Sequence, residues 1–343
     1  MTTEPTESST ERSWRQRLRL LPFLLLLGVG WAWVAGALYW FERWPPLVGG
    51  LAVLAWIAGT VTALLRLERR RAVLLLSAIG LGWMVVFLVV QRPRTDRAWS
   101  VDQERSLTVE LVDDGRVVLL DGVRNFRHRS LDDVDVAWEQ RRYELDDLSS
   151  LDLVVEPLPV VPGMAHVLLS FGFRDGRHLA ISAEIRKEQG ETYSPLAGMF
   201  RRYELAYVVA DERDVLALRL NARGNDLVIH PLRGTPEQLR ALFLAMLERA
   251  EELATSPEFY HSLGSTCASN LVRHFEDLRG APLPLDWRVL LPVHSDGLAW
   301  DLELIDGATT LDEARTRHRV SGPVPTDGEA TAFSRRVRAG WTG

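Results

Sequence analysis

Three apolar runs near the N-terminus constrain this 343-residue chain most, because each is long enough to cross a bilayer as one helix. They occupy residues 20–41, 47–65 and 72–90. None of them contains Asp, Glu, Lys, Arg or His, which argues against a transport path through them. A signal peptide explains the first run poorly, because the run is too long and two more follow. The sequence therefore predicts three N-terminal transmembrane helices that anchor the rest of the chain.

Arginine clusters predict the orientation of these helices. The tail 1–19 and the second link 66–71 are rich in arginine, whereas the first link holds Arg43 alone. By the positive-inside rule the tail and the second link face the cytoplasm, so three crossings deliver everything after residue 91 to the outer side. Lys187 is the only lysine, a bias typical of GC-rich bacterial genomes. The predicted location is the bacterial inner membrane, multi-pass, with a periplasmic C-terminal domain.

Changes in hydrophobicity and charge along the chain predict five segments. We predict a cytoplasmic basic tail at 1–19, a three-helix transmembrane anchor at 20–91, a linker at 92–105 and a periplasmic domain at 106–306. Residues 307–343 form a polar C-terminal tail that we expect to be loosely ordered. The net charge of −6 speaks against non-specific nucleic-acid binding.

In the periplasmic domain the sequence pattern predicts a series of strands followed by helices, which is typical of the α+β class. Helix 235–254 has Thr235 as N-cap, Pro236 at the first position and Gln238 to complete a capping box. A second helix opens near Cys267, after Ser265 or Thr266 as N-cap. The predicted strands are 107–112, 116–123, 134–145, 150–158, 166–173, 178–186, 203–210, 215–221 and 226–232.

Cys267 is the only cysteine, so no disulfide within the chain can form in the oxidising compartment predicted for it. Two interpretations stay open. Cys267 is a small buried apolar residue, as free cysteines usually are. Alternatively it is a nucleophile, because the first turn of a helix lowers a thiol pKa. The small polar surroundings, GSTCASN, are unlike a core and favour the second interpretation.

A thiol nucleophile needs a base, normally a histidine oriented by a polar group. His274 lies two helical turns after Cys267, about 10 Å along the axis, which is too far for a hydrogen bond. His261 precedes the helix, with nothing in the sequence to fix its position. His166 follows PGMA at the entrance of a predicted strand and is the stronger candidate, although it could equally be a satisfied surface or core histidine.

A polar face on the strand 178–186 suggests the lining of a site. Ser182, Glu184 and Arg186 alternate with apolar residues there. Glu184 either orients the histidine or pairs with Arg186, and the sequence leaves both open.

Other chemistry is weakly indicated. The sequence has no paired-cysteine zinc spacing, HExxH, phosphate-binding loop or GxSxG elbow. The stretches DERD (211–214) and HSDG (294–297) are predicted to be turns with solvated carboxylates rather than metal sites. No metal and no cofactor is predicted.

Four stretches resemble the periplasmic domain of the Lnb-type bacterial lipoprotein N-acyltransferases. They are VRNFRHRS (123–130), the block PGMAHVLLSFGF to LALRLN (162–221), SPEFYHSLGSTCASNLVRH (256–274) and DWRVLLPVHSDGLAWDLELID (286–306). The resemblance implies a permuted papain-like fold, in which an antiparallel sheet carries the histidine and a later helix carries the cysteine. His166 before Cys267 fits that order.

The resemblance further implies a function. Cys267 would take an acyl chain from a phospholipid donor and pass it to the N-terminal amine of a diacylated lipoprotein acceptor at the membrane. His166 would act as base and then acid, with Glu184 orienting it. Water must be excluded from such a thioester, so an apolar groove leading to Cys267 is expected. Family members carry asparagine immediately before the cysteine, where this chain has Thr266.

Two other functions remain open at this stage. A membrane-anchored cysteine peptidase or amidase acting on peptidoglycan or peptides would use the same pair of residues. A non-enzymatic periplasmic sensor or assembly module would carry an unreactive Cys267. A polar cleft would favour the peptidase, and an unperturbed thiol the sensor.

Overall fold

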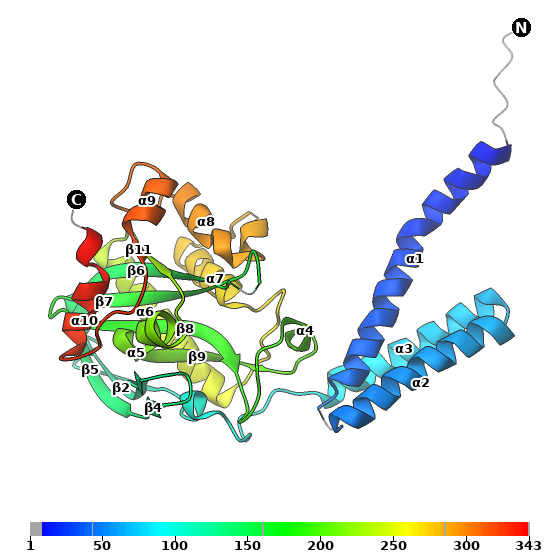
Figure 1. Cartoon of the computed structure of the whole chain (residues 1–343), viewed down its shortest axis with the longest axis horizontal. Coiled ribbons are helices and arrows are strands. Elements are labelled where there is room, and N and C mark those ends of the chain that lie inside the picture. The colour runs from blue at the N-terminus through cyan, green and yellow to red at the C-terminus, as the bar shows by residue number, and fades with distance from the viewer. Residues whose placement is uncertain (1–8, 43, 160, 285, 342–343) are drawn as a thin grey trace, which may run out of the picture. The chain divides into compact units, whose positions relative to one another are not determined.

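A computed structural model describes residues 9–42, 44–159, 161–284 and 286–341. Contacts divide the chain into two compact units. One comprises Met1–Arg92 with Phe200–Arg202, and the other comprises Pro93–Met199 with Tyr203–Gly343. We call them the helical unit and the domain; Figure 1 shows the order of their elements.

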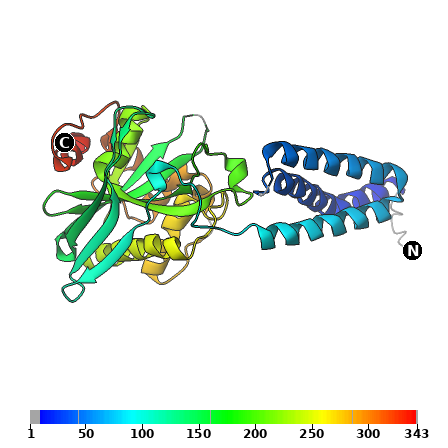
Figure 2. The same ribbon diagram turned by 90° about the horizontal axis from the view of Figure 1, so that it is seen from below.

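The helical unit consists of α1 (Ser9–Tyr39), α2 (Pro46–Arg66) and α3 (Arg69–Val90), which lie side by side (Figure 2). Both α2, with 21 residues, and α3, with 22, are long and apolar enough to cross a membrane, whereas the apolar stretch of α1, Leu24–Tyr39, is shorter. Phe200 belongs to this unit, its ring stacked on Trp40 at 5.1 Å. Two of the three predicted spans are thus helices of bilayer length, and the third is a helix with a shorter apolar stretch.

A nine-stranded sheet forms the centre of the domain, with the order β1-β2-β9-β8-β7-β6-β10-β11 and β5 beside β2. All pairs are antiparallel except β2 and β9, which meet in parallel at Arg124 and Ala210, so the sheet expected to be antiparallel is mixed. Its strands are β1 (Thr108–Val112), β2 (Val117–Arg124), β5 (Trp138–Glu144), β6 (Leu148–Pro157), β7 (Ala165–Phe173), β8 (His178–Arg186), β9 (Glu204–Asp211), β10 (Leu227–Pro231) and β11 (Arg319–Val320). A small second sheet pairs β3 (Arg127–His128) with β4 (Val134–Asp135).

Helices and single turns connect and cover the strands. The helices are α4 (Pro195–Gly198), α5 (Glu212–Ala217), α6 (Pro236–Thr255), α7 (Cys267–Arg279), α8 (Ser295–Asp301), α9 (Leu311–Arg317) and α10 (Ala330–Val337). The turns are η1 (Val101–Gln103), η2 (Leu145–Asp147), η3 (Leu218–Ala222), η4 (Trp287–Val289), η5 (Pro292–His294) and η6 (Ala339–Trp341); η3 is π-helical and the others are 3₁₀.

Side chains of β7 alternate between the two faces of the sheet, and different helices pack on each face. Phe171 and Phe173 point to α6, where both rings contact Phe243. Leu168 points the other way, into a buried cluster with residues of α5, η3 and α10. His166 and Ser170 lie two residues before and after Leu168, so their side chains point to the same face of the sheet as Leu168. The polar residues of β7 therefore lie on the α5 side.

Helices α6 and α7 confirm the capping signals. The Thr235 hydroxyl accepts from the Gln238 N–H and completes the predicted capping box. In α7 the N-cap is Thr266, which forms a capping box with Ser269, and Gly280 ends the helix with φ +70°.

The predicted strand 215–221 is wrong. The segment continues α5 and then winds into the π-helical turn η3. Asp211 caps α5 by accepting a hydrogen bond from the Arg213 N–H at 2.9 Å. The alternation of VLALRLN suggested a strand, but Leu and Ala are also strong helix formers, and this N-cap selects the helix.

The carboxylates of DERD and HSDG are buried and paired rather than solvated. Glu212 and Asp214 have no exposed surface, and Asp296 is 3% exposed. Asp296 accepts from Arg315 at 2.7 Å, and although burial alone would raise its pKa, this arginine keeps it well below the ordinary value. The arginines that compensate these charges come from distant parts of the chain, which the local sequence could not show.

The residues beyond Asp306 also differ from the expected loosely ordered tail. They form α9, β11, α10 and η6. Phe333 of α10 is fully buried among residues of β7, β8, β9 and α5. One apolar face on a short helix therefore suffices to dock the C-terminal segment on the sheet.

Phe333→Ala is expected to destabilise the domain by about 3–5 kcal/mol, because it removes a buried aromatic ring from the main core. Thermal unfolding of the full chain in detergent measures the loss as a lower Tm. Arg335→Ala changes an exposed residue of the same helix and should leave the Tm within experimental error. Equal melting of the two variants would contradict the packing described for α10.

Candidate active site

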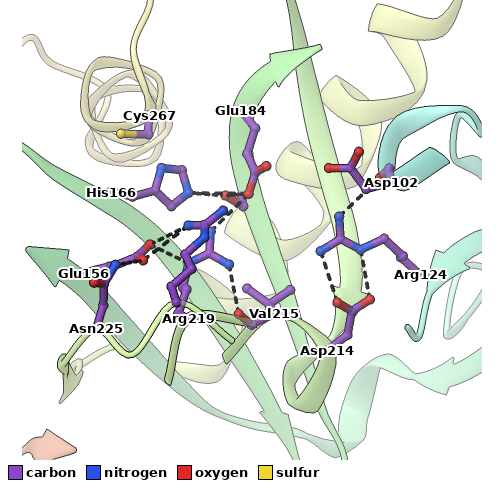
Figure 3. Close-up of polar contacts among 12 residues, drawn as sticks. Asp102, Arg124, Glu156, His166, Glu184, Asp214, Val215, Arg219, Asn225 and Cys267 are labelled. Atoms are coloured by element: carbon purple, nitrogen blue, oxygen red, sulfur yellow. Dashed lines mark hydrogen bonds and ion pairs between the residues drawn. The ribbon is translucent and has the colours of Figure 1, made fainter. Parts of the chain in front are cut away.

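The residues proposed from sequence come together where the start of β7 meets the start of α7. Cys267 is the first residue of α7, and His166 is the second residue of β7. Glu184 lies on the neighbouring strand β8. Figure 3 shows the His166 ring between the Cys267 sulfur and the Glu184 carboxylate.

The capping of α7 determines where the sulfur sits. Thr266 adopts an extended backbone with φ −98° and ψ 176°, and the helix begins directly after it. This places Cys267 in the first turn, where the helix dipole favours a negative charge. The side chain is 6% exposed, with its sulfur 4.0 Å from the Ala165 carbonyl oxygen. Thr266 thus acts as a cap.

The imidazole of His166 is held on its far side by two groups from β8. Its Nε2 lies 2.6 Å from the Ser182 hydroxyl oxygen and 3.5 Å from Glu184 Oε1. The Ser182 hydroxyl donates to Glu184 Oε1 at 2.9 Å. Ser182 therefore bridges the histidine and the carboxylate, which fixes the plane of the ring.

Of the two arrangements left open for Glu184, the structure brings it to His166 rather than to Arg186. The Arg186 guanidinium donates to the Gln103 carbonyl and lies over the Trp99 ring, 4.4 Å from its centroid. Glu184 instead accepts from Arg219 at 3.2 Å.

Arg219 is the residue that sequence reasoning missed, because 215–221 was assigned to a strand. Its guanidinium is 2% exposed and forms ion pairs with Glu184 and with Glu156, the latter at 2.9 Å. Arg223 and Asn225 complete the surroundings of Glu156. A lone arginine inside an apolar segment was the signal, since such a residue is rarely buried without a carboxylate partner.

Two other histidines lie apart from this group. The Nε2 of His274 is 3.0 Å from the Tyr207 hydroxyl. This agrees with the expectation that His274 lies too far along the helix to bond to Cys267. His261 Nδ1 accepts from the Leu263 N–H at 3.2 Å within the loop before α7.

The charges of the pair reinforce each other. Burial alone would raise the pKa of Cys267, but the adjacent His166 and the backbone N–H groups of Val167 and Ala268 lower it. Burial alone would lower the pKa of His166, but Cys267 and Glu184 raise it to about 9. Glu184 keeps its pKa well below the ordinary value, since His166 and Arg219 outweigh its burial. At neutral pH the arrangement favours a thiolate beside an imidazolium.

A cavity of about 480 Å³ leads to the pair. Part of its lining is charged, with Glu184, Arg219 and Arg223 among the residues. Another part is apolar or aromatic: Leu158, Met164, Leu218, Tyr193, Tyr260 and Pro292. Where the sequence predicts an apolar groove leading to Cys267, the structure has an amphiphilic cavity, within the volume range of small-molecule sites.

A group elsewhere in the domain has the donor types of a metal site. Ligand atoms of Asp152, His178 and Glu212 lie within 4.8 Å of one another. Arg338 donates to Asp152 at 2.6 Å and to Glu212 at 2.9 Å. Its guanidinium already provides the positive charge that these carboxylates need, so we assign the group to structure.

The pair predicts how alkylation of Cys267 depends on pH. The lowered thiol pKa means that the rate of reaction with iodoacetamide should level off at a lower pH than for an ordinary thiol. In His166→Gln the imidazolium is lost, so the rate should keep rising toward the ordinary thiol pKa of about 8.5. Because Cys267 is the only cysteine, label on Cys267→Ala gives the background. Identical pH profiles for the wild type and His166→Gln would contradict the ion pair.

Comparison with known proteins places this site within one described domain family. Residues 135–293 match the family model described as the Lnb N-terminal periplasmic domain, a range that contains His166, Glu184, Arg219 and Cys267. No curated protein and no solved structure matches the chain. This match supports the assignment of residues 135–293 to the Lnb-type family.

Proposed function

We propose that the protein is a membrane-anchored cysteine acyltransferase. It moves a fatty acyl chain from a phospholipid, through an S-acyl-Cys267 intermediate, to the N-terminal amine of bacterial lipoproteins. The match of residues 135–293 to the Lnb N-terminal periplasmic domain points to lipoprotein processing. The observation that carries the proposal is the Cys267–His166 pair, backed by Glu184 and facing an amphiphilic cavity.

In the first step the Cys267 thiolate attacks the carbonyl carbon of a phospholipid ester. The new C–S bond forms, the ester C–O bond breaks, and the imidazolium of His166 protonates the departing lysophospholipid oxygen. The backbone N–H groups of Val167 in β7 and Ala268 in α7, which act on the Cys267 sulfur, stabilise the oxyanion. The products are an S-acyl enzyme and a neutral His166.

In the second step the α-amine of the acceptor attacks the thioester carbonyl. A C–N bond forms, the C–S bond breaks, and neutral His166 takes the proton that the amine loses. The thiolate–imidazolium pair is thereby restored. The thioester divides an exchange of ester for amide into two displacements: protonation by His166 assists the departure of the alcohol in the first, and the thiolate is a good leaving group in the second.

Glu184 and Ser182 serve as positioning residues. The hydroxyl of Ser182 contacts both His166 and Glu184, so the ring is held in the orientation that directs it to the sulfur. The charge of Glu184 also favours the protonated ring, which the first step consumes and the second regenerates.

The mixed lining of the cavity suits this pair of substrates. A phospholipid and a lipidated N-terminus both join a polar group to an apolar chain. The partly exposed Arg223 provides a partner for polar groups, and Leu158 and Met164 contact hydrocarbon.

The charged part of the lining also favours a second candidate, a cysteine peptidase or amidase. Peptide or peptidoglycan bonds would be attacked by the same thiolate, with water as the final acceptor. The two candidates differ in what becomes attached to Cys267: a fatty acyl group or a peptidyl group.

For the membrane we propose three spans with a cytoplasmic N-terminus and a periplasmic domain, in a bacterial inner membrane. Single cysteines in Cys267→Ala test this arrangement with a membrane-impermeant maleimide on spheroplasts. Leu111→Cys in the domain should be labelled on intact spheroplasts, and Leu67→Cys, between α2 and α3, only after lysis. Labelling of Leu67→Cys on intact spheroplasts would refute the orientation.

Intact mass of the full chain after incubation with phospholipid vesicles tests the chemistry. The wild type should gain one fatty acyl mass that neutral hydroxylamine removes, because the adduct is a thioester. Cys267→Ala should gain none. Glu184→Gln should acylate at a rate lower by on the order of tenfold or more, because it loses the charge that supports the imidazolium.

The outcome separates the two candidates. No acyl adduct on the wild type, together with cleavage of a peptidoglycan fragment that depends on Cys267, would replace the acyltransferase with the amidase. Transfer of the acyl chain to a diacylated lipopeptide should release unmodified enzyme, which the same mass measurement detects.

A further inference from the structure

Two groups of loops flank the mouth of the Cys267 cavity. We call residues 158–164, apart from residue 160, together with 287–292 the first lip, and residues 193–196 with 260–263 the second lip. Each lip supplies residues to the cavity lining: Leu158, Met164 and Pro292 from the first, Tyr193 and Tyr260 from the second. Cys267 and Thr266 belong to the same lining. The lips are therefore the surfaces that a substrate meets on its way to the sulfur.

Hydrogen bonds hold the two segments of the first lip together. The turn between β6 and β7 closes with a bond from the Leu158 N–H to the Met164 carbonyl at 3.0 Å. The Val293 N–H then donates to the Gly163 carbonyl at 3.4 Å, which ties the turn to η5.

The second lip is tied in the same manner. The Ser262 hydroxyl donates to the Pro195 carbonyl at 2.7 Å, and the rings of Tyr193 and Tyr260 meet edge to face at 6.3 Å. The loop before α7 and the start of α4 thus form one ridge.

Exposed large apolar side chains concentrate on these lips. Of eleven such residues in the described part of the domain, seven lie there, although the lips are a small part of its length. The most exposed are Leu196 at 59%, Trp287 at 57%, Leu263 at 54% and Leu290 at 53%. Val161, Tyr193 and Leu291 complete the set. A gathering of this kind around a cavity marks an interaction surface.

The charge of the lips identifies what they meet. The chain has 46 Asp and Glu residues, yet the four lip segments contain none. Their only basic side chain is Arg288, apart from His261. Carboxylates are unfavourable at a bilayer surface, whereas Trp and Tyr are enriched at the level of the headgroups. The same chain carries two helices of bilayer length, α2 and α3, so a bilayer is within reach of the domain by covalent attachment.

We propose that the two lips insert their apolar side chains into the surface of the lipid bilayer, with the mouth of the Cys267 cavity open between them. This inference rests on the proposed function and adds the route of its substrates. A phospholipid passes from the bilayer into the cavity without exposing its chains to water. The lipid-modified acceptor enters by the same opening after the lysophospholipid leaves.

Depth measurement tests the docking independently of catalysis. Cys267→Ala removes the only thiol, and Leu263→Cys and Leu290→Cys then carry a nitroxide on the full chain in vesicles of phosphatidylethanolamine and phosphatidylglycerol. Collision with oxygen should exceed collision with a water-soluble nickel complex at both lip positions. Leu111→Cys, equally exposed at 52% but on β1, is the matched control and should show the reverse. Lip labels as water-accessible as the control, or shielded from both reagents by a second protein copy, would overturn the proposal.

Acylation by two donors tests the consequence for substrate entry. Leu263→Asp and Leu290→Asp should acylate Cys267 at least tenfold more slowly from vesicle phospholipid. Both should match the wild type with a short-chain phospholipid present as dissolved monomers, which shows that they fold. Leu111→Asp should match the wild type with both donors. Equal loss with both donors, or none with vesicles, contradicts entry between the lips.

The two experiments keep the docking and the proposed function apart. Immersed lip labels without any acyl adduct would support the docking and remove the acyltransferase. An acyl adduct with water-exposed lip labels would support the acyltransferase and remove the docking.

Discussion

The buried guanidinium of Arg219 is the contact on which the candidate site depends. It is 2% exposed and joins Glu156 of β6 to Glu184 of β8. Without it, two carboxylates would face each other in the interior, and breaking such a buried ion pair costs about 3–5 kcal/mol. His166 and then Arg219 lower the pKa of Glu184, Cys267 and then Glu184 raise the pKa of His166, and His166 lowers the pKa of the Cys267 thiol. A residue with no contact to the sulfur thus helps to set the charge on it.

Local signals in the sequence predicted the parts of the fold that are decided locally. The caps of α6 and α7 bind groups three residues away, so Thr235 and Gln238 could be recognised by spacing alone, and the cap of α7 could be narrowed to Ser265 or Thr266. Most strands followed from alternation. The residue patterns named Cys267, His166 and Glu184 as candidates, the family resemblance gave them roles, and the structure brings these three together.

Long-range contacts decided the parts that sequence reasoning missed. The alternating segment 215–221 turned into helix through a cap at Asp211 and packing against Phe333, more than a hundred residues later. The burial of Asp296 and Glu212 depends on Arg315 and Arg338, which no short window contains. Ser182 was visible as part of a polar face, but its place between His166 and Glu184 needed the register of β7 against β8.

The cavity joins two chemical environments that usually exclude each other. Buried ion pairs are favourable in a rigid, enclosed interior, whereas lipid chains need an apolar path to the surface. Among the residues that line it, Glu184, Arg219 and Arg223 come from β8, η3 and the position after η3, whereas Leu158, Met164, Tyr193, Tyr260 and Pro292 come from loops and turns. A thioester formed between the two zones would be protected from water on one side and supplied with protons on the other.

The position of the Arg219 guanidinium depends on the π-helical winding of η3. Its Arg223 N–H bonds to the Leu218 carbonyl, five residues back, so the backbone holds one residue more than an α-helical turn would. One residue of α-helix corresponds to about 100° of rotation. Deleting a single residue from this turn would leave the composition almost unchanged, yet it would swing the guanidinium of Arg219 away from both carboxylates. The reactivity of a thiol on α7 thus depends on the winding of a backbone segment almost fifty residues earlier in the chain.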